Sequence, residues 1–252
     1  MSQLLAAPVD LHQVAILLDV DGTIVDLAAT PREVFVPDSL RATLRRLWER
    51  TEGALALVSG RPLADLDLLF APLALPAVGV HGAEIRISAK ARANHGRAKP
   101  MSDEVKRRFA AIAGAGPGIL VEDKGYSIAL HYRLAPEKEQ FVRDAVLALS
   151  EELPNSFEVL PGKAVVEIKS AGFDKGTAVR RLMSRPPFAG RRPVFIGDDT
   201  TDEAAFAVLP EFDGVGISVG RRVAGVATCF DSPHDVRIWL EQISQVEEAP
   251  AE

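Results

Sequence analysis

The sequence contains one cysteine, Cys229, among its 252 residues, so a disulfide within the chain is impossible. It has no run of about 18 apolar residues, the length that a membrane-spanning helix needs, and even the apolar run of residues 14–18 stops at Asp19. Its first residues show neither a basic cluster nor a long apolar stretch, so the pattern of a secretory signal is missing. These absences predict a cytoplasmic protein with no membrane contact.

Positive charge is also scarce, because 29 lysines and arginines stand against 35 aspartates and glutamates, a formal net charge of −6. An acidic chain repels phosphate backbones, so nucleic-acid binding is not expected. Hydrophobic residues make up 47 % and charged residues 25 %, which excludes disordered and collagen-like classes. The length allows one large domain or two modest ones. We expect a monomer whose partner is a small molecule.

Two parts of the chain have the pattern of a parallel α/β sheet. Short apolar runs without alternation are typical of strands buried on both faces, and segments with helical spacing separate them. The expected strands are 14–18, 54–60, 77–80, 84–88, 193–197 and 215–219. The expected helices are 39–50, 65–70, 175–185, one after the segment TTDEAAF, and 234–243. Residues 1–88 and 170–252 are therefore predicted to form a Rossmann-like core, ending in a disordered acidic tail over about 247–252.

Between these parts lies a segment with a different pattern. Residues 89–100 are polar and basic, as in a linker. After them we expect a helix, two strands, a helix and two strands, the last two turning at Pro161 and Gly162. Their apolar residues alternate, which indicates a sheet with one exposed face. Residues 89–169 are therefore predicted to be an inserted α+β domain of the order αββαββ.

Two clusters of acids follow predicted buried strands. DVDGT occupies residues 19–23, and GDDTTDE occupies residues 197–203. A calcium loop starting at Asp19 is excluded, because its sixth position is Ile24 and its twelfth is Thr30. Open α/β sheets bind ligands at the carboxyl ends of their strands, and converging acids repel one another unless a cation lies between them. The clusters therefore predict a metal site.

These motifs resemble those of the haloacid dehalogenase superfamily of phosphatases, and within it the trehalose-6-phosphate phosphatases. The four motifs occur in the family's order: DVDGT, Ser59 in VSGR, Lys175 in FDKGTA, and GDDTTDE. The insert lies between the second and third motifs, where the family's larger cap, type C2B, is found. The resemblance implies that Asp19 attacks phosphorus and that Asp21 acts as acid and base. It assigns the catalytic residues as Asp19, Asp21, Ser59 and Lys175, and an Mg²⁺ site as Asp19, the backbone carbonyl of Asp21, Asp198 and Asp202.

The inserted segment resembles the trehalose-6-phosphate phosphatase version of the cap, which implies that substrate choice lies there. The expected substrate-binding residues are Gly60, Arg61, His81, Glu84, Lys124, His131, Arg133, Glu167 and Lys169. The cap residues of this set could instead be ordinary polar residues of a half-exposed sheet, and His81 and Glu84 could merely hydrogen-bond their loop. The implied reaction is hydrolysis of trehalose 6-phosphate. Phosphatases for sucrose 6-phosphate or mannosyl-3-phosphoglycerate, a phosphomutase, and a non-catalytic sugar-phosphate-binding module remain alternatives.

Overall fold

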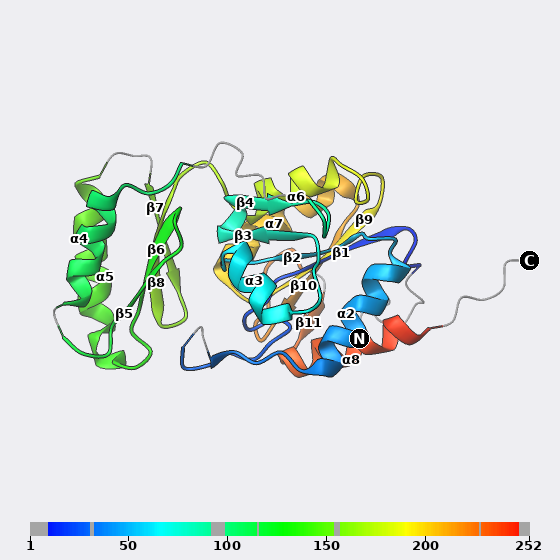
Figure 1. The fold of residues 1–252 in the computed structure, drawn as a ribbon, viewed down its shortest axis with the longest axis horizontal. Helices are drawn as coiled ribbons and strands as arrows, with labels where there is room; N and C mark the ends of the chain where they lie inside the picture. Colours follow the sequence, from blue (N-terminus) through cyan, green and yellow to red (C-terminus); the bar gives the residue numbers. More distant parts are fainter. Residues whose placement is uncertain are drawn as a thin grey trace, which may run out of the picture.

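The chain forms two separate sheets, one of seven strands and one of four (Figure 1). The computed structural model describes residues 10–30, 33–91, 99–114, 116–153, 157–226 and 228–246. The four-stranded sheet and its helices come from the segment between β4 and α6, and we call this part the cap. Within the described residues, no helix is long and apolar enough to cross a membrane.

The seven-stranded sheet of the core has the order β11-β10-β9-β1-β2-β3-β4 and is parallel except for the β3–β4 pair. Each strand is short, and β1 is buried along its whole length. The strands are β1 (Val14–Leu18), β2 (Leu55–Val58), β3 (Ala77–Gly79), β4 (Glu84–Arg86), β9 (Arg192–Gly197), β10 (Val215–Val219) and β11 (Thr228–Phe230).

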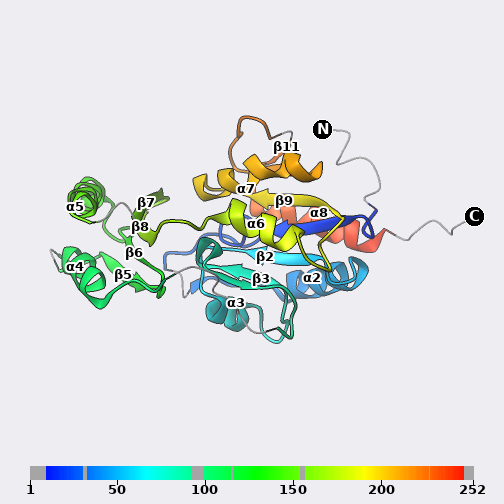
Figure 2. The same ribbon diagram turned by 90° about the horizontal axis from the view of Figure 1, so that it is seen from above.

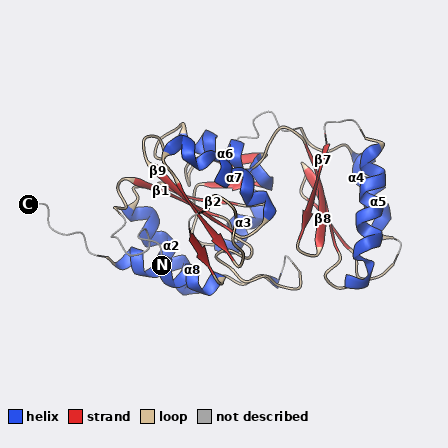
Figure 3. Ribbon diagram, turned by 180° about the vertical axis from the view of Figure 1, so that it is seen from behind, coloured by secondary structure: helices blue, strands red, loops and turns tan. Residues whose placement is uncertain are grey.

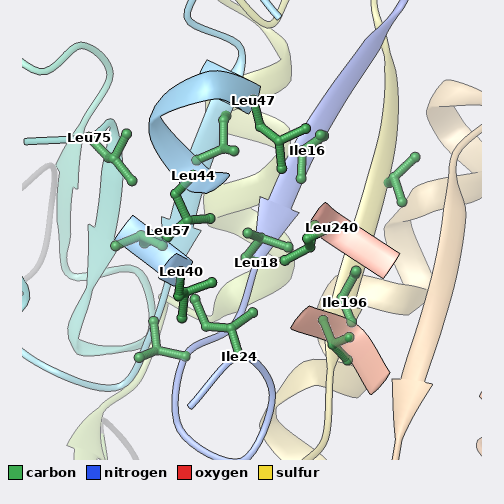
Figure 4. Close-up of a cluster of buried hydrophobic side chains, with 14 of the residues drawn as sticks. Ile16, Leu18, Ile24, Leu40, Leu44, Leu47, Leu57, Leu75, Ile196 and Leu240 are labelled. Carbon is green, nitrogen blue, oxygen red and sulfur yellow. The ribbon is translucent and has the colours of Figure 1, made fainter. Parts of the chain in front are cut away.

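Helices cover both faces of this sheet, which is why its strands are apolar on both sides. Ile16 and Leu18 of β1 face one layer, whereas Leu17 faces the other. The first layer contains α2 (Asp38–Arg50), α3 (Leu63–Phe70) and α8 (Pro233–Gln245). Figure 4 shows leucines of α2 and Leu240 of α8 next to Ile16 and Leu18 of β1. The second layer contains α6 (Lys175–Met183) and α7 (Glu203–Val208), and Figure 2 shows α6 and α7 across the sheet from α2 and α3. Short 3₁₀ helices are η2 (Val80–Gly82), η4 (Thr200–Asp202) and η5 (Leu209–Phe212).

The cap is an antiparallel sheet covered by helices on one face only. Its strand order is β5-β6-β8-β7. Ile128 and Leu130 of β6 pack against Phe109 and Val142 of the helices, and the helices lie on the side away from the core (Figures 1 and 3). The elements are α4 (Asp103–Ala113), β5 (Leu120–Asp123), β6 (Ser127–His131), η3 (Pro136–Lys138), α5 (Glu139–Glu151), β7 (Phe157–Gly162) and β8 (Val165–Ser170). The other face is therefore directed towards the core.

The predicted α/β fold class and the αββαββ order agree with these elements, with two differences. Pro161 and Gly162 are the last residues of β7, and the chain turns at Lys163 and Ala164. Proline fits there because β7 is an edge strand, where a missing N–H leaves no neighbour unpaired. The short strand β11 was not predicted, because its three residues show no apolar run. The predicted tail at 247–252 and most of the predicted linker lie outside the described residues.

Candidate active site

The first carboxylate loop starts where β1 ends, at the carboxyl edge of the core sheet. Asp19 follows Leu18 directly, and its N–H donates to Ile196 O of the neighbouring strand (2.9 Å). Gly22 has a φ of +81°, and a Cβ placed on it would lie 2.8 Å from Asp198 Cγ. Glycine at this position therefore lets the first loop pack against the second carboxylate segment.

Three buried aspartates meet at this edge. Asp19, Asp198 and Asp202 each offer a carboxylate oxygen, and these oxygens lie within 4.8 Å of one another. Lys175 Nζ is 2.7 Å from Asp19 Oδ1 and 2.7 Å from Asp202 Oδ1. Thr23 Oγ1 lies 2.9 Å from Asp19 Oδ2 and 3.2 Å from Asp198 Oδ1. Thr23 belongs to the DVDGT motif, but the sequence did not predict that it contacts both aspartates.

Burial controls the protonation of this cluster. Removal from water raises the pKa of Asp19 to about 6, although Lys175 acts in the opposite direction. Burial likewise raises the pKa of Asp202 to about 6. For Lys175, burial lowers the pKa, but the carboxylates of Asp19 and Asp202 outweigh it and the net pKa is raised. Lys175 therefore stays charged, and the three acids favour additional positive charge beside them.

The start of α6 holds Lys175 in place. Asp174 caps the helix, because its Oδ1 accepts from Thr177 N at 2.6 Å and its own N–H donates to Thr177 Oγ1 at 3.0 Å. A Cβ on Gly176 would lie 2.9 Å from the backbone carbon of Ala204, so the first turn of α6 packs directly against α7. This close approach brings Lys175 next to Asp202, just before α7.

Ser59 and Arg61 also line the core side of the site, and they follow β2 directly. Ser59 is 1 % exposed, and its Oγ accepts from Arg61 N at 3.1 Å. The Arg61 guanidinium binds both oxygens of Asp21, with distances of 2.6 Å from Nε to Oδ2 and 2.7 Å from Nη2 to Oδ1. Such a bidentate pair fixes the orientation as well as the position of a carboxylate. Asp21 is therefore held beside Ser59.

The inner face of the cap carries a chain of charged side chains. His131 Nε2 is 2.8 Å from Glu122 Oε2, and Lys124 Nζ is 2.7 Å from Glu167 Oε2. Burial acts to raise the pKa of Glu167, but Lys124 and His81 outweigh it, so the pKa lies well below the usual range. Glu167 is therefore a buried carboxylate. The prediction that His131 and Glu167 share one face of the sheet agrees with their register across β6 and β8.

The cap closes over the aspartates through direct contacts. Lys163 Nζ, from the β7–β8 turn, is 2.5 Å from Asp198 Oδ2. Arg133 Nη1 donates to Ala28 O, and Thr200 Oγ1 donates to Pro161 O at 3.4 Å. The cap is therefore in contact with both carboxylate loops of the core.

A cleft of about 180 Å³ lies between the core and the cap. Most of the residues predicted for the site line it: Asp19, Asp21, Ser59, Gly60, Arg61, His81, Lys124, His131, Arg133, Glu167, Lys175 and Asp198. The predicted metal ligand Asp202 lies behind this lining and is fully buried. Its neighbour Asp199 instead accepts from Thr200 N at 2.7 Å, so its carboxylate caps η4 and does not join the triad.

Two predicted substrate-binding residues lie outside the lining of the cleft. Glu84 Oε2 accepts from Leu63 N at 2.8 Å and so binds the first N–H of α3, which the helix itself cannot satisfy. Lys169 Nζ, almost fully buried, donates to Phe173 O at 2.5 Å and pairs with Glu158 at 2.6 Å. Alternation along β8 put Lys169 on the same face as Glu167 but did not indicate that it lies beyond the edge of the cleft.

Glu122 and Lys163 line the cleft but were not predicted. The alternation of β5 gives no signal for Glu122, because this strand is exposed along most of its length. Lys163 occupies a hairpin turn, where a lysine is ordinarily solvated. A signal for it would have required knowing that this turn points into the core.

Comparison with known proteins identifies the family. A model of the family described as trehalose-phosphatase matches residues 17–229. The chain belongs to the trehalose-phosphatase family. A probable trehalose-phosphate phosphatase from Sinorhizobium fredii is 41 % identical over 215 residues, covering 85 % of this chain and 81 % of that protein. The trehalose-6-phosphate phosphatase of Escherichia coli is 37 % identical over 230 residues, covering 90 % and 85 %.

The fold is also that of solved members of this group. The C-terminal domain of the Candida albicans trehalose-6-phosphate phosphatase superposes with a TM-score of 0.83 at 21 % identity, covering 94 % of this chain and 93 % of that one. The match includes both the core and the cap. The predicted fold class and the resemblance drawn from the four motifs are thereby confirmed.

Proposed function

We propose that this protein removes the phosphoryl group of trehalose 6-phosphate, releasing trehalose and phosphate. Membership of the trehalose-phosphatase family supports this substrate. The observation that carries the proposal is the cleft, in which Asp19, Ser59 and Lys175 of the core face the Glu167–Lys124 pair of the cap. One wall suits a phosphoryl group and the other suits sugar hydroxyls. Residues 89–169 act in this proposal as the unit that selects the sugar.

Asp19 is the proposed nucleophile. Its carboxylate is held by Lys175 and Thr23 on its two oxygens and is 5 % exposed. Attack of a carboxylate oxygen on phosphorus forms an aspartyl phosphate and breaks the bond to the sugar oxygen. Water then hydrolyses the aspartyl phosphate and regenerates Asp19. Lys175 and Ser59 stabilise negative charge on the phosphoryl oxygens during both steps.

Asp21 is the proposed acid and base. It gives a proton to the departing sugar oxygen and later takes one from the attacking water. Both of its oxygens now accept from Arg61. Protonation turns one oxygen into a hydroxyl that accepts much more weakly, so we expect Arg61 to loosen its bond to that oxygen when Asp21 takes up a proton. The phosphoryl group of the substrate offers Arg61 an alternative bidentate partner.

The buried aspartates fit a magnesium ion. All donors are oxygens, the ligand type that Mg²⁺ prefers. Among the described residues, Lys175 pairs with Asp19 and Asp202, whereas Asp198 pairs with Lys163, whose side chain is half exposed. We assign Asp19, Asp198 and the Asp21 carbonyl as ligands, with Asp202 supporting them through Lys175. When bound, Mg²⁺ would offset the repulsion between the carboxylates and the phosphoryl oxygens and polarise the phosphoryl group.

An uncharged disaccharide is recognised through hydrogen bonds to its hydroxyl groups. Oε1 of Glu167 is buried and has no hydrogen-bond partner among the described residues, so it can accept from a sugar hydroxyl. Lys124 holds the other oxygen of this carboxylate in place. We assign substrate binding to residues of both walls: Gly60 and Arg61 beside the phosphoryl group, and His81, Lys124, His131, Arg133 and Glu167 beside the sugar.

Phosphate release from a panel of sugar phosphates tests the proposal. The panel contains trehalose 6-phosphate, sucrose 6-phosphate, mannosyl-3-phosphoglycerate and glucose 6-phosphate, with magnesium present. We expect kcat/KM for trehalose 6-phosphate to exceed the others by at least about 10²-fold, because the unmatched sugars leave buried polar groups unpaired. A higher value for another sugar phosphate would reassign the substrate. Transfer of the phosphoryl group to a second sugar position without phosphate release would indicate a phosphomutase.

A further inference from the structure

We propose that His81 is a positioning residue that fixes Glu167 of the cap relative to the phosphoryl-binding loop, residues 59–61. The proposal rests on the function proposed above and adds a residue that acts on the sugar through Glu167. Its consequence is that the core sets the distance between the phosphoryl group and the sugar subsite. When the cap closes, only a substrate whose phosphoryl group and sugar are separated by this distance fits both sites.

The backbone of His81 is held against the phosphoryl-binding loop in a strained conformation. The φ angles of Val80 and His81 are +44° and +54°, which is unusual for a histidine and rarer still for a β-branched valine. Val80 N–H donates to Arg61 O at 2.9 Å, and His81 N–H donates to Ser59 O at 3.0 Å. Strain of this kind persists only where surrounding contacts determine the conformation, and here both contacts go to one loop.

The imidazole itself packs on this loop. A Cβ placed on Gly60 would lie 2.6 Å from His81 Cε1 and 2.7 Å from Nε2, so the ring occupies the space that a larger residue would need. His81 is 8 % exposed. Movement of the phosphoryl-binding loop is therefore transmitted directly to the ring.

The ring reaches across the cleft to the cap. His81 Nε2 lies 3.3 Å from Glu167 Oε2. The pKa of Glu167 lies far below its usual range, so its carboxylate can only accept, and Nε2 must carry the hydrogen. The same oxygen also accepts from Lys124 at 2.7 Å. Lys124 thus holds Glu167 from within the cap, and His81 contacts Glu167 from the core.

The contact between His81 and Glu167 leaves the second oxygen of Glu167 for the sugar. His81 Nδ1 and Glu167 Oε1 are both buried, and neither has a hydrogen-bond partner in the described parts of the chain. Both residues line the cleft. Glu167 Oε1 belongs to an ionised carboxylate and can only accept, so in this proposal it is the atom that accepts from a sugar hydroxyl. Orienting Glu167 therefore also orients the acceptor that faces the sugar.

Two substitutions separate the ring contact from the backbone. His81→Asn keeps a residue that tolerates positive φ but is too short to reach Glu167 from the position of Nε2. His81→Gln carries a longer amide that can donate to the carboxylate. An exposed histidine of α8 supplies the matched control, His234→Ala. Binding of trehalose and of inorganic phosphate is measured separately, as inhibition constants, on the magnesium-loaded full chain.

We expect His81→Asn to weaken trehalose binding by about 10-fold or more, the effect of one lost hydrogen bond to a charged group, and phosphate binding by less than about 3-fold. His81→Gln should recover part of this loss. In a double-variant cycle, His81→Asn should add little to Glu167→Gln, because both act through one contact.

Equal weakening of trehalose and phosphate binding would overturn the proposal, since it would mean that His81 merely supports the 59–61 loop. Fully additive effects of His81→Asn and Glu167→Gln would overturn it as well. The unsubstituted protein tests the proposed function separately. If that function is wrong, this protein will neither bind trehalose nor hydrolyse trehalose 6-phosphate. That result would remove the sugar for which His81 is proposed to position Glu167.

Discussion

Replacing Glu167 by alanine tests the sugar-binding wall of the cleft. The side chains of Glu167 and Lys124 are 7 % and 9 % exposed and lie 2.7 Å apart. Without Glu167, the ion-pair partner left to Lys124 among the described residues is Glu122, at 3.9 Å. Breaking a buried pair in this way costs about 3–5 kcal/mol of folding free energy. For a chain of this size, the melting temperature should fall by about 6–20 °C.

The effect on catalysis should depend on the substrate. Loss of the carboxylate leaves sugar hydroxyls unpaired in a closed site, so kcat/KM for trehalose 6-phosphate should fall by about 10²-fold or more, on the order of 3 kcal/mol of transition-state binding. Turnover of a small aryl phosphate, which has no second glucose, should change by only a few fold. Steady-state kinetics on both substrates, below the melting transition, measure the contrast.

A second variant separates specificity from folding. Replacing both partners, Lys124→Met with Glu167→Leu, removes the uncompensated charge and should restore most of the stability. It should not restore activity on trehalose 6-phosphate. Glu151→Ala, on the exposed end of α5, is the control for loss of a cap carboxylate. Equal losses on both substrates would mean that Glu167 supports cap closure, and no loss on either would make it an ordinary polar residue of the sheet.

Three further predictions concern the carboxylates of the core. Asp19→Asn should leave a folded protein with essentially no phosphatase activity, because an amide cannot form the acyl phosphate; near-normal activity in a preparation free of host enzymes would exclude Asp19 as the nucleophile. Asp21→Asn should lower kcat by about 10²–10⁴-fold, the usual contribution of acid–base catalysis, and unchanged kcat would remove Asp21 from this role. Lys163→Ala should tighten magnesium binding, measured by calorimetry without substrate, because the Lys163 ammonium group lies 2.5 Å from Asp198 and repels a cation there. Weaker binding in this variant would contradict that competition, and activity retained in excess chelator would contradict the metal site itself.

The carboxylate side of the site could be predicted from sequence because its residues directly follow strands in the chain. Asp19, Ser59 and Asp198 each follow a buried strand directly, so recognising the strands placed the three side chains at one sheet edge. Lys175 was predictable only from the family resemblance, since a lysine at a helix start is ordinarily solvated. Nothing in the spacing of the chain shows that it pairs with both Asp19 and Asp202.

The cap was predictable as a sheet but only partly as a binding surface. Alternation identifies which residues share a face, and it placed His131 with Glu167 correctly. It does not show where along that face the cleft ends, which is why Lys169 was expected at the site. The contacts of Lys163 and Glu122 depend on how the cap meets the core, a packing of segments far apart in the chain. Neither periodicity nor local propensity contains that information.

The position of Lys169 has a mechanical consequence. The cap is an insertion, so the chain crosses between it and the core twice, once after β4 and once between β8 and α6. The second crossing covers only residues 171–174, and Lys169 shortens its reach further by binding Phe173 O and lying 4.6 Å from the Phe173 ring centroid. A crossing this short lets the cap turn about it but not move away from it. Residues 171–174 are therefore the pivot that we expect for any opening of the cap.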